Sequence, residues 1–173
     1  MNKNLAKIIN KMAVIDQKMR RRAMKTGIWD KRIDKQNTLK MRRIVKKYGW
    51  PMINMAGKKA SKNAWLLIQH ADHNLRFQKY CLNLMEKIYK KNPEEILKAN
   101  IAYLKDRVLV NEGKKQVFGT QFYTNKKGIF GSRLIKDIKN VDKRRKKYGL
   151  PSFDKYKKLM KNYKAVPVKK IVK

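Results

Sequence analysis

Residues Asn63 to Gln78 read NAWLLIQHADHNLRFQ, and this stretch is the least charged window of a very basic chain. It contains one Arg and one Asp, and it holds both histidines of the sequence, His70 and His73. Apolar residues with few charged neighbours are the ones that a folding chain buries. We therefore expect the core of the protein, and any buried chemistry, to lie in this stretch.

The rest of the chain is dominated by positive charge. Among 173 residues there are 47 Lys and Arg against 12 Asp and Glu, which gives a formal net charge of +35. The length suits one domain with its own core. A chain with this charge repels itself and calls for a polyanionic partner. Nucleic acid is the usual partner, because each neutralised phosphate releases a condensed counterion.

Several other classes of protein fit the sequence poorly. The single Cys81 excludes an internal disulfide and suits a reducing compartment. No Cys/His spacing matches a zinc site, and we expect neither a metal nor a cofactor. No apolar run approaches the roughly 18 residues that a membrane span needs.

Hydrophobic periodicity predicts a series of helices joined by short turns. The expected elements are helices at 3–22, from about 34 or 37 to 48, 58–71, 73–90 and 93–106, a β-hairpin within 108–123, and helices at 134–148 and from 152. In the first helix the apolar stripe predicts that Leu5, Ile8, Ile9, Met12, Ile15 and Met19 face inward.

Local end signals support these helices. The strings 46–51 (KKYGWP) and 146–151 (KKYGLP) each place cations, a Gly and a Pro where a helix ends. Asp72 suits the N-cap of the helix that follows it. Asn92-Pro93-Glu94-Glu95 has the residues of a capping box, with Pro at the first helical position, and predicts the start of the helix at 93–106.

Together these signals predict a mainly α fold of the α+β type. We expect a compact helical domain of about six or seven helices, with one β-hairpin and basic terminal arms. The expected divisions are a basic amphipathic N-terminal helix at 1–22, a single helical domain at 23–163 with the hairpin near 108–123, and a basic C-terminal arm at 164–173.

An ordered set of short motifs resembles an uncharacterised bacterial family of domains of unknown function, numbered 6624. The matching strings are Asp16-Gln17 with Arg20, 48–51 (YGWP), 64–65 (AW), 69–72 (QHAD), 77–78 (FQ), 102–104 (AYL), 106–108 (DRV), Gly113, Gln116, 119–121 (GTQ), 141–142 (VD), Arg145 and 149–151 (GLP). The resemblance spans roughly residues 12–160 and implies a mostly helical domain, with no activity to carry over. This chain departs from the family pattern in Phe118, where Tyr is expected, and in its lysine content.

Five polar residues are the candidates for a catalytic site: His70, Asp72, Asp106, Arg107 and Gln121. A His beside a carboxylate can act as a general base, while Gln and Arg can stabilise developing negative charge. His70 and Asp72 are two residues apart, so only a helix break between them would bring them together. No nucleophile elbow or P-loop accompanies them. A structural polar cluster is the alternative interpretation, and the resemblance adds that of an ancestral site.

Clusters of cations are the candidates for nucleic-acid binding. They are Arg20, Arg21, Arg22, Arg42, Arg43, Lys46, Lys47, Lys143, Arg144, Arg145, Lys146 and Lys147. Like charges at this spacing destabilise a helix unless an anion lies between them, and a phosphate backbone is such an anion. A merely solvated face is the alternative. Aromatic residues near these clusters (Trp29, Tyr48, Trp50, Tyr148 and Phe153) are candidates for stacking on unpaired bases, or for the core.

The sequence therefore favours a structural RNA-binding protein of a large ribonucleoprotein particle. A ribosome is the leading case, with contacts to rRNA phosphates and neighbouring proteins, either mitochondrial or in the cytoplasm. Three alternatives stay open: an enzyme of unknown reaction with a His/Asp/Gln site, a DNA-packing or virion protein, and a module that docks acidic proteins. The sequence shows no helix-turn-helix or zinc-finger signature that would indicate sequence-specific DNA recognition.

Overall fold

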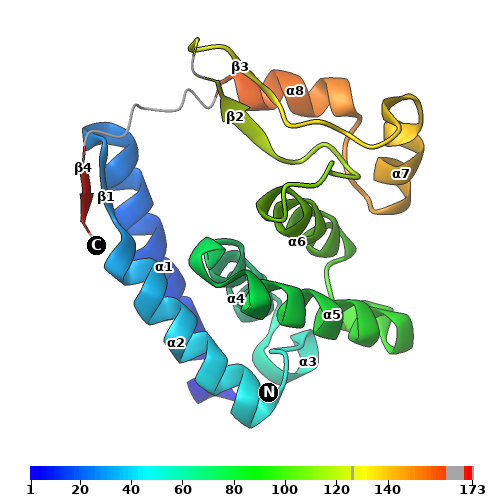
Figure 1. The fold of residues 1–173 in the computed structure, drawn as a ribbon. Helices are drawn as coiled ribbons and strands as arrows, with labels where there is room; N and C mark the ends of the chain where they lie inside the picture. Colours follow the sequence, from blue (N-terminus) through cyan, green and yellow to red (C-terminus); the bar gives the residue numbers. More distant parts are fainter. Residues whose placement is uncertain (126, 163–169, 173) are drawn as a thin grey trace. The chain divides into compact units, whose positions relative to one another are not determined.

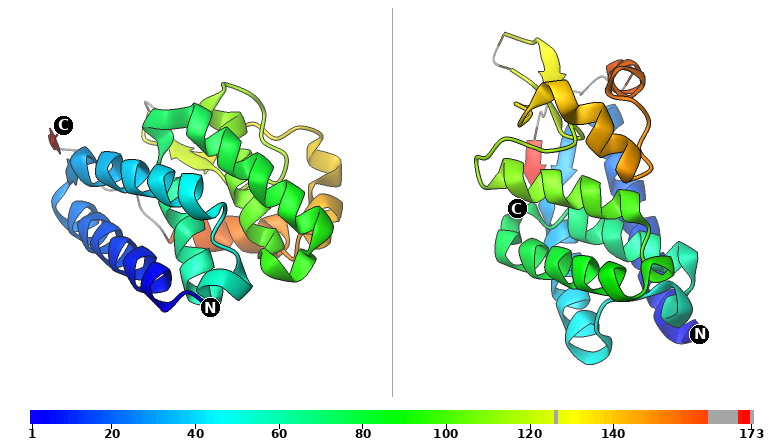
Figure 2. Two further views of the ribbon diagram at one scale, coloured as in Figure 1. Left: turned by 90° about the horizontal axis from the view of Figure 1, so that it is seen from below. Right: turned by 90° about the vertical axis from the view of Figure 1, so that its right-hand side faces the viewer.

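The computed structural model describes residues 1–125, 127–162 and 170–172. The fold is mainly α, as the sequence predicts (Figures 1 and 2). The chain divides into two compact units, which are described separately: unit 1 comprises Met1–Leu97 and Val166–Lys173, and unit 2 comprises Lys98–Ala165. In the described ranges no helix has both the length and the apolar character that crossing a membrane requires.

Unit 1 is built from helices and one small parallel strand pair. Its elements are α1 (Lys3–Thr26), β1 (Ile28–Asp30), α2 (Lys31–Tyr48), α3 (Ile53–Ala56), α4 (Lys58–Gln69), the 3₁₀ turn η1 (Asp72–Asn74), α5 (Leu75–Lys91), the 3₁₀ turn η2 (Pro93–Glu95) and β4 (Lys170–Val172). Strand β4 pairs with β1 in parallel, with Trp29 opposite Ile171. The sequence does not predict this pair. The rest of the predicted C-terminal arm, 164–169 and 173, lies outside the described residues.

Helices α1 and α2 form a helical hairpin, and they run side by side in Figures 1 and 2. Gly27 ends α1 in the left-handed conformation (φ 75°), where its N–H donates to the Ala23 carbonyl. Asp30 then caps α2 by accepting from the Arg32 N–H. Because of this cap, α2 begins at Lys31 rather than at the predicted 34 or 37.

The core of unit 1 lies where α1 packs against α4, as the low-charge stretch predicts. Ala64, Leu67 and Ile68 of α4 are buried, and so are Leu5, Ile9, Met12 and Met19 of α1. Two members of the predicted α1 stripe, Ile8 and Ile15, are exposed instead. The amphipathic N-terminal helix is thus part of the core, and its buried face is narrower than predicted.

Unit 2 contains α6 (Lys98–Asn111), β2 (Phe122–Thr124), β3 (Phe130–Ser132), the 3₁₀ turn η3 (Ile138–Asn140), α7 (Val141–Lys147) and α8 (Phe153–Lys161). Ala102, Phe118 and Leu150 form a buried cluster, against which Tyr103 and Tyr148 pack. Ser152 caps α8 by accepting from the Lys155 N–H, so this helix begins one residue after the predicted start at 152. Helix α7 is shorter than the predicted 134–148.

The predicted hairpin within 108–123 is wrong in its position. Residues 108–111 form the last turn of α6, so the β-branched side chains there belong to a helix. The antiparallel pair is β2 with β3, in which Tyr123 lies opposite Gly131. Its turn contains Asn125, whose side chain accepts from the Ile129 N–H.

Two predicted helix starts are also corrected. The Asn92-Pro93-Glu94-Glu95 signal opens only η2, and α6 begins at Lys98. The buried Glu95 side chain accepts from the Asn54 N–H (Oε2 to N, 2.8 Å) at the start of α3. Asn74, rather than Asp72, caps α5 by accepting from the Phe77 N–H. The two helix ends predicted at Gly49 and Gly149 are confirmed, with φ of 72° and 66°.

The Glu95 contact gives a test of this assignment. Replacing the buried Glu95 by Ala leaves the Asn54 N–H without this charged acceptor, and we expect the free energy of unfolding to fall by about 1–3 kcal/mol. Glu94 is the exposed neighbour with the same charge. Glu94→Ala should change stability by less than about 0.5 kcal/mol in urea unfolding. Equal effects of the two variants would show that Glu95 is no cap for α3.

Candidate nucleic-acid interface and charge cluster

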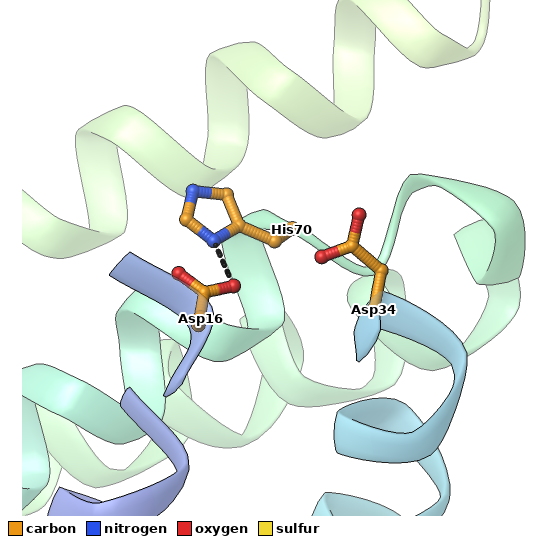
Figure 3. A group of neighbouring side chains, drawn as sticks. All are labelled: Asp16, Asp34 and His70. Carbon is orange, nitrogen blue, oxygen red and sulfur yellow. Dashed lines mark hydrogen bonds and ion pairs between the residues drawn. The ribbon is translucent and has the colours of Figure 1, made fainter. Parts of the chain in front are cut away.

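Four ionisable side chains meet inside unit 1. We call Asp16, Arg20, Asp34 and His70 the charge cluster (Figure 3 draws Asp16, Asp34 and His70). Asp16 and Arg20 lie one turn apart on α1, Asp34 lies in the first turn of α2, and His70 is the C-cap of α4. The α1–α2 hairpin and the α1–α4 packing therefore bring them together.

The contacts of the cluster centre on Asp16, which is fully buried. Its carboxylate lies 2.9 Å from His70 Nδ1 and 3.3 Å from Arg20 Nε, and it also accepts from Gln17 Nε2. Arg20 Nη2 donates to Asp34 Oδ1 over 2.6 Å. One guanidinium thus joins two carboxylates from two helices, which is the fork geometry that Arg provides.

His70 Nδ1 has two partners in the charge cluster. It lies 2.9 Å from both Asp16 Oδ1 and Arg20 Nε. A protonated Nδ1 donates to the ionised Asp16 carboxylate, whereas an unprotonated Nδ1 accepts from Arg20 Nε–H, so the two contacts use different protonation states of this nitrogen. In Figure 3 the second ring nitrogen, Nε2, lies on the side of the ring away from Asp16.

The two carboxylates of the cluster differ in their pKa. Burial raises the pKa of Asp16, but the hydrogen bond from His70 and the charges of His70 and Arg20 outweigh it, so the net pKa is lowered. For Asp34 burial is the dominant effect, and its pKa is raised despite the charge of Arg20. Asp16 therefore stays ionised, while Asp34 takes up a proton first on acidification.

The donor set raises the question of a bound metal ion. Ligand atoms of Asp16, Asp34 and His70 lie within 4.8 Å of one another. However, Arg20 bonds to both carboxylates, and its guanidinium supplies the positive charge that a metal would bring. The residues therefore fit an ion network that ties together α1, α2 and α4 rather than a metal site.

The structure gives His70 a partner that the sequence does not predict. His70 pairs with Asp16, a residue 54 positions away. Asp72 is exposed and accepts from Gln78 Nε2 (3.1 Å), which also donates to the Ile68 carbonyl. The α4–α5 junction is thereby fixed by Gln78. Asp34 and the role of Asp16 were not predicted, although Asp16 is the one acidic residue of α1 and lies among its buried residues, which is a signal in the sequence.

The other predicted catalytic residues belong to unit 2. The buried Asp106 carboxylate accepts from the N–H groups of Val117, Phe118 and Thr120 and from the Thr120 hydroxyl, over 2.7–3.1 Å. Burial raises its pKa, and these hydrogen bonds lower it only in part. Asp106 thus holds the loop before β2. Arg107 Nη1 donates to Gln121 Oε1 (3.2 Å), so this predicted pair does meet.

Three of the cations predicted to bind nucleic acid are engaged inside the protein. Arg20 belongs to the charge cluster. Arg145 is fully buried and donates to the carbonyls of Phe118 and Pro151. Arg144 donates to the carbonyl groups of residues 117, 136 and 137. The guanidinium groups of these residues organise the fold, and they are not needed for the interface considered below.

The remaining predicted cations are on the surface. They are Arg21, Arg22, Arg42, Arg43, Lys46, Lys47, Lys143, Lys146 and Lys147, all exposed. Of the aromatic candidates, Trp50 is buried, Phe153 packs near Phe122, and Tyr148 packs against Phe118. Trp29 lies under the Arg20 guanidinium (5.5 Å), and Tyr48 lies under the Lys47 ammonium (5.0 Å).

Several of the exposed cations line one hollow of unit 1. We call it the α2–α5 groove; it has a volume of about 890 Å³ and is lined by Arg42, Arg43, Val45, Lys46, His73, Asn74, Arg76, Phe77 and Tyr80. No carboxylate belongs to this lining. Within the described ranges, no carboxylate lies within 4.0 Å of the charged nitrogens of Arg42, Arg43, Lys46 or Arg76. Sequence analysis did not find Arg76 or Tyr80, since each stands alone in a weakly charged stretch.

Comparison with known proteins gives the chain a family. Residues 4–169 match the family of unknown function DUF6624, and the chain belongs to that family. This confirms the resemblance seen in the sequence. Searches among curated proteins and among solved structures gave no match.

The opposite pKa shifts of Asp16 and Asp34 predict opposite pH dependences. A lowered folded pKa stabilises the protein above the unfolded value and loses this effect as the pH falls through the folded pKa. A raised folded pKa stabilises the protein below the unfolded value, and this effect is lost as the pH rises through the folded pKa. The stability difference between wild type and Asp34→Asn should therefore fall as the pH rises above the ordinary Asp pKa of about 3.9.

Asp16→Asn provides the comparison of opposite sign. The stability difference between wild type and Asp16→Asn should grow as the pH rises towards about 3.9 from below. Both differences come from urea unfolding followed by circular dichroism across the pH series. Slopes of the same sign for the two variants would contradict the assigned pKa shifts.

The buried Arg145 is tested against its exposed neighbour. Arg145→Gln removes the donor to the Phe118 and Pro151 carbonyls, and we expect a loss of roughly 2–4 kcal/mol in the free energy of unfolding. Lys146→Gln removes the same charge from the surface and should change stability by less than about 0.5 kcal/mol. If Arg145→Gln is as stable as the wild type in urea unfolding, the structural role assigned to Arg145 is contradicted.

Proposed function

We propose that the protein binds RNA through its phosphates, as a structural component of a large ribonucleoprotein particle. The observation that carries this proposal is the α2–α5 groove, where cations that have no carboxylate partner among the described residues line one hollow. The net charge of +35 supports the same partner class. A ribosome, mitochondrial or otherwise, is the particle that we propose first, and the neighbours there would include other proteins.

The cations that line the groove repel one another. Arg42 and Lys46 lie one turn apart on α2, with Arg43 beside them, and Arg76 contributes a further positive charge from α5. Like charges at such spacing are unfavourable, and a phosphate placed among them reverses the sign of the interaction. Each phosphate met also releases condensed counterions, so affinity rises steeply at low salt.

The other exposed cations extend the same surface chemistry. Arg21 and Arg22 lie on the last turns of α1, and Lys143, Lys146 and Lys147 lie on α7 in unit 2. A polynucleotide, unlike a small anion, can contact many such groups at once. The charge cluster has a different role in this proposal: its internal pairing fixes α1, α2 and α4, and thereby positions the α2 side of the groove.

The salt dependence of RNA binding tests the proposal. Replacing Arg42, Arg43, Lys46 and Arg76 together by Gln should weaken binding of structured RNA and reduce the log–log salt slope by roughly 3, because about 0.7–0.9 of a unit is lost per phosphate contact. Fluorescence anisotropy across a salt series measures both quantities. Circular dichroism should show an unchanged fold, since the four side chains are exposed.

A variant with the same charge change controls for net charge. Lys7, Lys11, Lys90 and Lys91 are exposed in unit 1 and do not line the groove. Their replacement by Gln should lower the slope much less. Equal losses in both variants would contradict the groove as the binding surface, and salt-insensitive or absent RNA binding would overturn the proposal. Tighter binding to duplex DNA than to RNA would favour the DNA-packing alternative.

Sedimentation addresses the proposed particle. The native protein should sediment in lysate with a large RNA-containing particle and move to the light fractions after ribonuclease treatment. A protein that stays with a large particle after complete RNA digestion is held by protein contacts instead. That result would favour the alternative of a module that docks acidic proteins.

A further inference from the structure

The α2–α5 groove combines its cations with an exposed aromatic ring. Tyr80 is 53% exposed, although a ring of this size is usually covered at least on one face. Phe77 lies one turn before it on α5 and is 8% exposed, so it forms an apolar part of the lining. The groove therefore offers an aromatic surface beside guanidinium groups.

The arrangement of these groups follows from helix geometry. Arg76 and Tyr80 are separated by four residues on α5, so their side chains are neighbours on one face. Arg42 and Lys46 have the same spacing on α2. The groove thus has one wall of cations, and a second wall with a cation and a ring. Its volume of about 890 Å³ lies within the range of about 300–1,000 Å³ that is typical of ligand sites.

We propose that this groove is a binding subsite for an unpaired nucleotide of RNA. Its phosphate and the flanking phosphates of the strand contact the guanidinium groups of Arg42, Arg43 and Arg76, and its base stacks on the Tyr80 ring. His73 and Asn74 also line the groove and carry groups that can hydrogen-bond to a base edge. This inference rests on the proposed function and adds a preference for single-stranded segments.

The preference arises because stacking needs a free base face. In a duplex both faces of each base are covered by the neighbouring pairs, so only the phosphates remain available to the groove. In a loop or at a strand end the base can turn outward and stack on an aromatic side chain. Cations without a ring would bind both forms of RNA through charge alone.

Substitution of Tyr80 separates stacking from charge. Tyr80→Ala should raise the dissociation constant for a short single-stranded RNA roughly 5- to 150-fold, the range that corresponds to about 1–3 kcal/mol per stacked base. The affinity for duplex RNA and the salt slope should not change. Tyr80→Phe keeps the ring and should bind single strands like the wild type. Urea unfolding of each variant verifies that the fold is intact.

A fluorescent base reports the contact directly. A single-stranded oligonucleotide that carries one 2-aminopurine should lose fluorescence on binding to wild type and Tyr80→Phe, and lose much less with Tyr80→Ala. The stacking subsite is overturned if Tyr80→Ala weakens the binding of single-stranded and duplex RNA equally. It is also overturned if Tyr80→Ala weakens the binding of neither RNA. If no salt-dependent binding to either RNA is found, it is the proposed function itself that fails.

Anionic lipid is the other source of clustered phosphates. Vesicles of phosphatidylcholine with and without phosphatidylserine provide the test by co-sedimentation. We expect binding to anionic vesicles to be weaker than to single-stranded RNA at the same salt, and to be unaffected by Tyr80→Ala. Vesicle binding that exceeds RNA binding and is lost in Tyr80→Ala would assign the groove to a lipid surface and overturn the nucleotide proposal.

Discussion

The ion pair and hydrogen bonds of the buried Asp16 hold unit 1 together. A carboxylate without exposure to water is costly unless it is paired, and Asp16 is paired with both Arg20 and His70. Arg20 in turn bonds to Asp34. Three helices therefore meet at one charged centre, and any rearrangement of α1, α2 or α4 would leave an unpaired charge. The apolar packing of α1 on α4 sets their approach, and this centre fixes their register.

The basic residues of the chain have two physical roles. Arg20, Arg144 and Arg145 are donors to carboxylates and carbonyls inside the units, where a planar guanidinium can make several directed hydrogen bonds. The cations of the α2–α5 groove have no such partners in the described parts of the chain. Net charge alone does not distinguish these roles. Burial and partner atoms do, and they define the surface that is available to a polyanion.

The sequence predicts the helices well because their apolar period and end residues are local signals. The prediction fails where the local structure depends on a group that is distant in the sequence. Glu95 belongs to a convincing capping box, yet its carboxylate accepts from Asn54 and the next helix begins later. Residues 108–111 resemble a strand by composition, but they continue α6 because tertiary context overrides β propensity. Sequence analysis selects His70 as a candidate, but its partner Asp16 is 54 residues away, and no local spacing reveals such a pair.

The separation of 54 residues between Asp16 and His70 has a consequence during synthesis of the chain. The apolar face of α1, with Leu5, Ile9 and Met12, is covered by α4, which begins at Lys58. During synthesis at about 5–20 residues per second, the ribosome needs roughly 3–10 s to extend the chain from Asp16 to His70. For that time a newly made α1 presents its apolar face beside a lysine-rich one to the cellular environment. An early encounter with a chaperone would shield this face until α4 is available.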